Sequence, residues 1–444
     1  MKRFASLCLI LCLLLAAVPV RAERIAIPDA LRFTQKSPEA EYVRDRQFIQ
    51  RTYPVTANEQ VNAAMRALID QMADTARPYL PTGKMDLMPS YLDVGSTISR
   101  TGSQWMSFLT IARIAYEREQ TYVDFDARVY DMETGSPVAL TDLFAPDSEA
   151  WALMADAVRQ QLGDYFMTEE ADPAALDALC SREALENTPF TLTPAKLELH
   201  FRADALYPGK STLMHAKLYY SAPRPLMTAL GQQITDNSQY KMIALTFDDG
   251  GARGATNNLL NQLRRTGANA TFFIVGTMMY SNHDVMCRQQ DAGYAMASHN
   301  FEHVYNGINE STVREWSQKF DQLMDSIVGI RPEYMRAPGG MYGKFIAADA
   351  NMPLIQWSIN SSDSGNENVM QVAQTVINNA RDGGVALMHD LNPRVYQYAE
   401  IILADLEARN YLCVTVDELF DHYGVPLEPN QVYYGCEDEA KAQK

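Results

Sequence analysis

The sequence predicts an α/β protein of two domains, with a (β/α) barrel in the C-terminal half and an α+β domain before it. After residue 240, apolar strand-like runs alternate with amphipathic helical patterns, as in a parallel sheet covered by helices. Before residue 223, one long helical pattern is followed mainly by strand-like runs between turn residues, which is typical of an α+β domain. The length of 444 residues also favours two or three domains.

The first 22 residues are typical of a secretory signal peptide. Lys2 and Arg3 precede an apolar run over residues 4–18, and Val20-Arg21-Ala22 has small outer residues, as a signal peptidase site requires. The run is shorter than the about 20 residues that span a bilayer. We therefore expect export, to the envelope or beyond it. The alternative is an uncleaved segment that tethers the protein to the membrane.

The charge restricts the partners. The net charge is −17, and the leader contributes three basic residues and no acid, so its removal makes the chain more acidic still. Nucleic-acid affinity depends on Lys and Arg neutralising phosphates, so we expect no nucleic-acid partner. The same charge disfavours electrostatic adhesion to anionic lipids or wall polymers.

Four cysteines follow the leader: Cys180, Cys287, Cys413 and Cys436. Export permits disulfides, and the sequence leaves all three complete pairings open. A Cys413–Cys436 bond would tie down the C-terminal tail, and unpaired buried thiols are the alternative. No CxxC pair occurs, so we expect no structural zinc site built from cysteines.

The N-terminal half opens with apolar residues at helical spacing over residues 59–80. Strand-like runs follow at 105–115, 122–130 and 197–201, and residues 129–135 read as a hairpin that leads to a helix at 140–144. We expect His200 and His215 to be ordinary core or surface residues and not ligands.

The C-terminal half has a regular order of elements. Apolar strands are predicted at 242–247, 270–275, 294–297, 355–359, 385–388 and 412–416. Helices are predicted at 255–265, 311–327, 369–380 and 396–408. In a (β/α) barrel, catalytic groups lie at the C-terminal ends of the strands, so the residues after each strand are the candidates for a site.

Two polar clusters have the composition of a metal site. Asp248 and Asp249 follow the first strand, and adjacent carboxylates at a strand end point in different directions, so one can bind a metal while the other acts as a base. A tight turn is the alternative. His299 and His303 follow a later strand, and four-residue spacing on one helical turn would let them chelate one ion. A solvated histidine pair is the alternative.

Three further clusters also follow strands. Arg336 lies in the segment Met335-Arg336-Ala337-Pro338-Gly339-Gly340, where proline and glycines shape a loop with exposed backbone amides. Asp363 lies just beyond the predicted strand at 355–359, and His389 follows the one at 385–388. Five such clusters after strands are a conjunction that chance rarely gives.

This ordered set resembles the NodB-type polysaccharide deacetylases, carbohydrate esterase family four. The order is DDG, HxxxH, RxPxG, an Asp beyond a WxxN strand and LxH, with the spacer at residues 269–273, and it covers residues 240–424. The resemblance implies a distorted (β/α) barrel. Residues 129–144, 190–193 and the turn at 207–209 resemble an extracytoplasmic domain of bacterial lysozyme-sensing anti-sigma factors and some wall deacetylases.

Roles follow from the resemblance position by position. Asp249, His299 and His303 match the metal ligands; the ion is usually zinc, and cobalt or manganese can substitute. Asp248 matches the general base and His389 the general acid.

The remaining matches support these groups. Arg336 matches the residue that orients the base, Asp363 the residue that holds the catalytic histidine, and Gly339 the position whose backbone N–H stabilises the oxyanion. Three positions depart from the family pattern: Asn300, Asn360 and Ser364. The last stands where a tryptophan often lines the groove, which puts substrate shape in doubt.

The resemblance implies hydrolysis of N-acetyl groups from N-acetylhexosamines of a cell-envelope polysaccharide, with peptidoglycan favoured. Chitooligosaccharides or O-acetyl xylan are alternative substrates, and a non-catalytic carbohydrate-binding envelope protein is the alternative of another class. The expected organisation is a signal peptide (1–22), an accessory domain (23–228), a linker (229–239), the deacetylase domain (240–424) and a tail (425–444).

Overall fold

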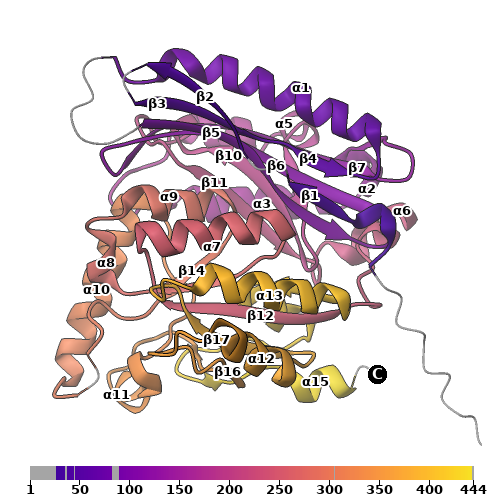
Figure 1. Cartoon of the computed structure of the whole chain (residues 1–444). Coiled ribbons are helices and arrows are strands. Elements are labelled where there is room, and N and C mark those ends of the chain that lie inside the picture. The colour runs from indigo at the N-terminus through magenta and orange to yellow at the C-terminus, as the bar shows by residue number, and fades with distance from the viewer. Residues whose placement is uncertain (1–26, 36–37, 45, 83–89, 305, 443–444) are drawn as a thin grey trace, which may run out of the picture.

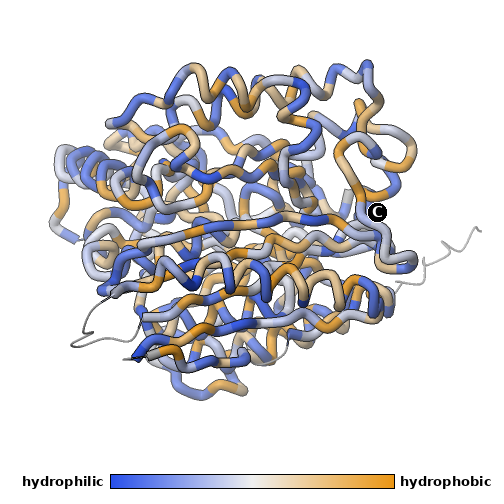
Figure 2. The backbone as a smooth tube through the Cα atoms, turned by 90° about the horizontal axis from the view of Figure 1, so that it is seen from above, coloured by the Kyte–Doolittle hydropathy of each residue, from blue (hydrophilic) through white to orange (hydrophobic). Residues whose placement is uncertain are grey.

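The computed structural model describes residues 27–35, 38–44, 46–82, 90–304 and 306–442, which form two parts packed against each other (Figure 1). The expected signal peptide, with Cys8 and Cys12, lies outside these residues. Within the described ranges no helix has both the length and the apolar character to cross a membrane, and hydrophilic residues interrupt the hydrophobic ones along the chain (Figure 2).

The N-terminal part is α+β. Its helices and strands are η1 (Asp29–Leu31), β1 (Phe33–Gln35), β2 (Glu39–Arg44), β3 (Gln47–Thr52), β4 (Pro54–Thr56), α1 (Glu59–Ala76), η2 (Arg77–Tyr79), β5 (Ser90–Thr101), β6 (Trp105–Tyr116), β7 (Glu119–Asp131), β8 (Pro137–Val138), α2 (Leu140–Leu143), α3 (Ala150–Leu162), α4 (Pro173–Leu179), α5 (Arg182–Glu186), β9 (Phe190–Leu192), β10 (Lys196–Arg202), η3 (Ala203–Ala205), β11 (Leu213–Tyr219) and η4 (Arg224–Leu226).

A six-stranded sheet of order β2-β3-β5-β6-β7-β8 dominates this part, and β9 to β11 form a smaller antiparallel sheet. Asn58 caps the N-terminus of α1, because its side chain accepts hydrogen bonds from the backbone N–H groups of Gln60 and Val61. The face of α1 that packs on the sheet carries the apolar residues whose spacing predicted the helix, from Val61 to Met72.

The C-terminal part is α/β. Its elements are α6 (Ala229–Ile234), β12 (Lys241–Asp249), α7 (Arg253–Thr266), β13 (Thr271–Ile274), α8 (Gly276–Met279), α9 (His283–Asp291), β14 (Ala295–Ser298), α10 (Glu310–Val328), η5 (Pro338–Gly340), α11 (Gly343–Ala347), β15 (Leu354–Ile355), β16 (Ile359–Asn360), α12 (Val369–Asn379), β17 (Gly384–His389), α13 (Val395–Ala408), β18 (Tyr411–Val414), α14 (Val416–His422), β19 (Val432–Tyr433) and α15 (Glu437–Ala442).

The sheet of this part is parallel and curled. β12 pairs in parallel with β13, β17 and β18, β13 continues to β14, and parallel bridges through Met335 lead on to β15. On the other side β17 pairs with β16, which is only three residues after β15. The result is the distorted (β/α) barrel that the strand–helix alternation and the family resemblance predicted, so the fold class is confirmed.

One predicted strand is interrupted. Residues 355–359 form the ends of β15 and β16 and not one strand. The reason is that the carbonyl oxygens of Ile355 and Gln356 accept hydrogen bonds from the Arg336 side chain and not from a neighbouring strand.

The two parts share a hydrophobic core. Residues of α1 and of the large sheet, such as Phe108, belong to the same buried cluster as Met242 and Leu419 of the barrel. The six-stranded sheet has α1 on one face and α7 and α9 of the barrel near the other (Figure 1).

The stretch expected as a linker is packed. Residues 229–239 contain α6, in which Ile234 is buried. The buried Asn237 accepts a hydrogen bond from the Gly102 N–H and donates one to the Pro194 carbonyl. These hydrogen bonds of Asn237 to backbone groups of the N-terminal part hold the junction in place. The domain boundaries themselves stay predictions.

Cys180, Cys287, Cys413 and Cys436 are buried free thiols, so the alternative without disulfides holds. The C-terminal tail is held by backbone contacts instead. β19 pairs with β15, and the Cys436 N–H donates to the Gly383 carbonyl.

Candidate active site

The polar residues expected at strand ends meet at one edge of the barrel. In the parallel register of β12 and β17, Asp248 pairs with His389. Asp249 pairs with Ile274 at the end of β13. The carbonyl of Ile274 accepts a hydrogen bond from the backbone N–H of His299, which lies just beyond β14. Because parallel strands end on the same side, these residues converge although up to 141 positions separate them in the sequence.

The two adjacent aspartates face different partners. Asp248 is buried, and its Oδ1 accepts a hydrogen bond of 2.6 Å from Arg336 Nη1. Asp249 has a backbone φ of 82°, in the left-handed region, which is costly for a non-glycine residue and is found at functional sites. Its Oδ1 lies 3.6 Å from His303 Nε2 and 3.8 Å from His299 Nε2.

The histidine pair does not lie on a helix, so the expectation of a shared helical turn is wrong. His299 to His303 form a loop in which Asn300 has φ of 67°, and a left-handed residue ends a regular helix. Hydrogen bonds from Gly276 and Thr277 to the carbonyls of Asn300 and Phe301 tie this loop to α8. The loop nevertheless brings the two rings together, with centroids 5.1 Å apart.

His299 is held as a neutral ring with one nitrogen available. Its Nδ1 lies 2.8 Å from the Arg336 carbonyl, which only accepts, so Nδ1 carries the hydrogen. Burial lowers the pKa of His299, despite the nearby carboxylates that raise it. Its Nε2 lone pair therefore faces Asp248 Oδ2 at 3.6 Å and Asp249 Oδ1.

Asp249, His299 and His303 have the geometry of a metal site. One ligand atom from each lies within 4.8 Å of the others. Asp249 Oδ1 is buried and has no hydrogen-bond partner among the described residues. One carboxylate and two imidazoles are a ligand set that zinc and similar divalent ions accept, so these residues fit such an ion.

Arg336 links the end of β15 to Asp248 and Thr246 of β12. It is completely buried and donates to Asp248 Oδ1, to Thr246 Oγ1 at 2.9 Å, and to the carbonyls of Ile355 and Gln356. Its guanidinium also lies over the Phe273 ring at 4.0 Å. These contacts fix the rotamer of the guanidinium, which in turn holds the Asp248 carboxylate.

His389 and Asp363 form a hydrogen-bonded pair. His389 Nδ1 lies 2.7 Å from Asp363 Oδ1, and the His389 N–H donates to Asp363 Oδ2 at 2.8 Å. Burial would lower the pKa of His389, but the hydrogen bond and charge of Asp363, with Asp248 and Asp249, raise it to about 9. Burial would raise the pKa of Asp363, but its bonds to His389 and Tyr398 hold it below the usual value. The imidazole is therefore protonated at neutral pH.

A cleft of about 270 Å³ opens beside this pair. Asp249, Asp363 and His389 line it together with Ser364 to Glu367 and Leu391 to Pro393. Gly339 lies in η5 with φ of 62°, a conformation that glycine adopts readily. The expected role of its N–H stays a prediction.

Two supporting residues were not predicted. Tyr398 on α13 donates to Asp363 Oδ2 at 2.6 Å. Asp390 accepts hydrogen bonds from the N–H groups of Gly250 and Gly251 and from Thr256 Oγ1, so it holds the loop after Asp249. The sequence offered a signal for Asp390, because it directly follows His389 at the end of a predicted strand. It offered none for Tyr398, which lies in an apolar helical pattern typical of core residues.

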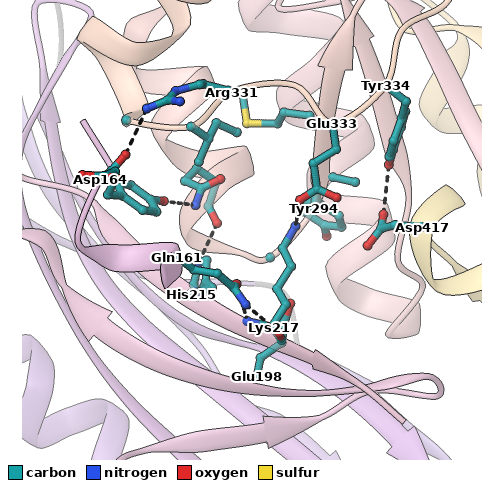
Figure 3. A pocket seen from close by; sticks show the side chains of 17 residues that line it. Gln161, Asp164, Glu198, His215, Lys217, Tyr294, Arg331, Glu333, Tyr334 and Asp417 are labelled. Carbon is teal, nitrogen blue, oxygen red and sulfur yellow. Dashed lines mark hydrogen bonds and ion pairs between the residues drawn. The ribbon is translucent and has the colours of Figure 1, made fainter. Parts of the chain in front are cut away.

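The accessory histidines lie elsewhere. His200 and His215 are both buried, and His215 lines a cavity of about 210 Å³ between the two parts (Figure 3). The cavity walls are held by Lys217 Nζ at 3.5 Å from Glu333 Oε1 and by a 2.9 Å hydrogen bond from Tyr334 to Asp417 (Figure 3). The expectation that these two histidines are core residues agrees with their burial.

Comparison with known proteins identifies related chains. Residues 235–353 match the polysaccharide deacetylase family. Peptidoglycan-N-acetylglucosamine deacetylase PgdA of Listeria monocytogenes is 27% identical over 318 residues, which covers 70% of this chain and 67% of that one. This is more than the barrel supplies, so the similarity extends into the N-terminal part.

Two other relatives match a shorter stretch. Peptidoglycan-N-acetylmuramic acid deacetylase PdaC of Bacillus subtilis is 27% identical over 46% of this chain and 44% of its own length. A bifunctional xylanase/deacetylase of Pseudobutyrivibrio xylanivorans is 29% identical over 45% of this chain and 33% of its own.

Proposed function

We propose that this chain, which belongs to the polysaccharide deacetylase family, hydrolyses the N-acetyl groups of N-acetylhexosamines in a cell-envelope polysaccharide, with peptidoglycan as the favoured polymer. The observation that carries the proposal is the meeting of two sets of groups at one barrel edge. Asp249, His299 and His303 surround a common point, and the carboxylate of Asp248 and the imidazole of His389 lie at paired positions of neighbouring strands.

The three ligand residues would hold a divalent ion, most consistent with zinc, with cobalt or manganese as substitutes. Such an ion, when bound, activates water and polarises the acetyl carbonyl. The orphaned Oδ1 of Asp249 and the Nε2 lone pair of His299 support this assignment.

Asp248 is proposed as the general base. Arg336 occupies its Oδ1, which leaves Oδ2 directed to the region of the histidines, where it can accept a proton from the attacking water. The same guanidinium keeps the carboxylate in one orientation.

His389 is proposed as the general acid. Its raised pKa keeps it protonated at neutral pH, as donation to the departing amine requires. Asp363 orients the ring through Nδ1, so that Nε2 is the proton-donating atom. The backbone N–H of Gly339 is proposed to stabilise the tetrahedral oxyanion.

The substrate and location are also proposals. PgdA of Listeria and PdaC of Bacillus are peptidoglycan deacetylases by name, and the similarity to PgdA includes the N-terminal part. An exported chain with such a part would meet the wall first. We therefore propose an extracytoplasmic enzyme, released or retained at the envelope.

The test is acetate release by residues 23–444 from peptidoglycan, N-acetylglucosamine oligomers and acetylated xylan. Release that a chelator abolishes and zinc restores would support metal-dependent deacetylation, and the preferred polymer would decide the substrate. No release from any acetylated polymer, by protein that binds one equivalent of metal, would favour a carbohydrate-binding protein without activity.

A further inference from the structure

A small cavity between the two parts is lined by three arginines. It has a volume of about 30 Å³ and lies between β5 and β6 on one side and α7 and α9 on the other. Arg113 belongs to β6, Arg264 to α7 and Arg288 to α9. In a chain of net charge −17, three guanidinium groups at one place call for a counter-charge.

Two carboxylates line the same cavity and balance only part of this charge. Asp93 Oδ2 lies 3.2 Å from Arg264 Nη1 and 3.8 Å from Arg113 Nε. Asp291 accepts hydrogen bonds from Gln120, Thr212 and the Leu213 N–H, and burial raises its pKa to about 6. Even with both acids ionised, one positive charge remains.

Arg288 is the least compensated of the three. Its Nη1 donates to Asn257 Oδ1 at 2.7 Å, and its Nη2 donates to Asn261 Oδ1; both acceptors are neutral. Burial and the two neighbouring arginines lower its pKa to about 9. The charge of Asp93 counteracts this shift, but Asp93 is shared with the other two arginines, and the two side-chain hydrogen bonds of Arg288 go to neutral acceptors.

Two buried donors at the cavity are unused. Within the described part of the chain, the Tyr294 hydroxyl and Arg113 Nε have no hydrogen-bond partner. Tyr294 is 5% exposed, and both residues line the cavity. A buried donor without an acceptor is costly, so an acceptor that enters the cavity from solution would stabilise this arrangement.

The larger cavity of the same interface differs in this respect. There Lys217 Nζ faces Glu333 Oε1 at 3.5 Å, and the carboxylates of Glu198 and Asp417 also line the walls (Figure 3). Tyr294 lines both cavities, but the positive excess is confined to the arginine cavity.

We propose that the arginine cavity binds one small monovalent anion of the size of chloride. The volume exceeds the roughly 10–15 Å³ that a single water needs, so one small ion can enter. The anion neutralises the excess charge, accepts from the unused donors, and thereby fixes β5 and β6 of the N-terminal part to α7 and α9 of the barrel. It is a structural ligand, separate from the proposed reaction.

The first test compares the melting temperature of residues 23–444 in sodium chloride and in sodium gluconate at equal ionic strength. We expect chloride to raise Tm by a few degrees in a saturable way, because it binds the folded state only. Equal Tm values in both salts would overturn the proposal.

Two variants make the test specific. Tyr294→Phe removes one donor and should raise the chloride concentration for the half-maximal Tm shift by about tenfold. The control Tyr240→Phe loses the hydroxyl that donates to the Gly102 carbonyl outside the cavity, and should lower Tm equally in both salts. If both variants respond to chloride like the parent, the assigned site is wrong.

A bromide-soaked crystal tests the position directly. We expect an anomalous peak between Arg264, Arg288 and Tyr294. A water at that place and no bromide peak would overturn the proposal even if chloride stabilises the protein by another route.

Discussion

The protein contains two histidine pairs in close contact, and only one of them has the features of a metal site. In the pair His200 and His215, the Nδ1 atoms lie 2.7 Å apart, and the Nε2 atoms contact Thr191 Oγ1 and the Gln290 carbonyl. All four ring nitrogens are therefore occupied by the protein itself. In the pair His299 and His303, the Nε2 atoms both face the oxygen Asp249 Oδ1.

The comparison teaches that proximity of histidines does not make a ligand set. Both pairs contain a ring whose pKa burial lowers; that of His200 falls to about 3. The two pairs differ in their hydrogen bonding. In the barrel, the Nε2 lone pair of His299 and the oxygen Asp249 Oδ1 face a common point. In the N-terminal part, all ring nitrogens of His200 and His215 are engaged in contacts within the protein. The predictions below test this difference.

The largest effect is expected from the ligands. His299→Ala or His303→Ala should abolish metal binding and lower kcat/KM by more than the roughly 100-fold that follows loss of an outer partner. Metal content by elemental analysis and acetate release check this. Full metal content in both variants would remove the ligand assignment.

The matched control is in the other pair. His200→Gln should leave metal content and turnover unchanged and should lower the free energy of unfolding by about 1–3 kcal/mol, because it disturbs a buried hydrogen-bond chain. Denaturant titration measures this loss. A drop in bound metal would mean that the accessory pair contributes to the metal site.

The next largest effect is expected from the base. Asp248→Asn should keep the metal and lower turnover by about 10²–10⁴-fold, since an amide cannot accept the proton. Retained turnover would sink the assignment of Asp248. The comparison with His299→Ala then separates binding from proton transfer.

A pH-dependent effect is expected from Asp363→Asn. The pKa of His389 is raised to about 9, largely by Asp363, so the acid is protonated below that pH and lost above it. Without the carboxylate this pKa falls, and the alkaline limb of the kcat profile should move to lower pH, with kcat reduced about 10–100-fold. An unmoved limb would show that another group sets it.

The His389–Asp363 pair should also make the free energy of unfolding depend on pH. Because the folded pKa of His389 is raised, its contribution is fully present below pH about 6.5 and is lost as pH rises through about 9. The stability difference between the metal-free parent and Asp363→Asn should shrink over that window. Chemical denaturation at several pH values measures it.

The smallest effect is expected from Tyr398→Phe. It removes one hydrogen bond to Asp363 Oδ2 and leaves the bond to His389 in place. We expect up to about 1.5 kcal/mol of lost stability and a kcat effect below tenfold. A loss as large as that of Asp363→Asn would assign Tyr398 a more direct part in positioning His389.

Much of the fold was predictable because its elements carry local patterns. The ends of α1, α7, α10 and α13 lie within a few residues of the predicted ranges, since their apolar faces repeat at helical spacing. The segment at 355–359 was predicted less well. There the carbonyls that a strand would pair with its neighbour are turned to Arg336, a residue about 20 positions earlier in the chain.

The candidate site residues were predictable where polar side chains directly follow a predicted strand. Asp248, Asp249, His299, Asp363 and His389 all stand in short motifs at strand ends, which the parallel order of the barrel gathers at one edge. The helical turn assigned to His299 and His303 was wrong, because the left-handed Asn300 and hydrogen bonds from α8 shape a loop.

The sequence alone predicted the barrel, the resemblance to polysaccharide deacetylases and the candidate site residues, because strand–helix alternation and short motifs are local along the chain. Tertiary structure alone decided which side chains support them and what lies between the two parts. Tyr398 reaches Asp363 across 35 positions, and Arg113 of the N-terminal part lines the same cavity as Arg288 of the barrel. Such contacts depend on how helices and sheets pack, and side chains brought together in this way leave no periodic signal in the sequence.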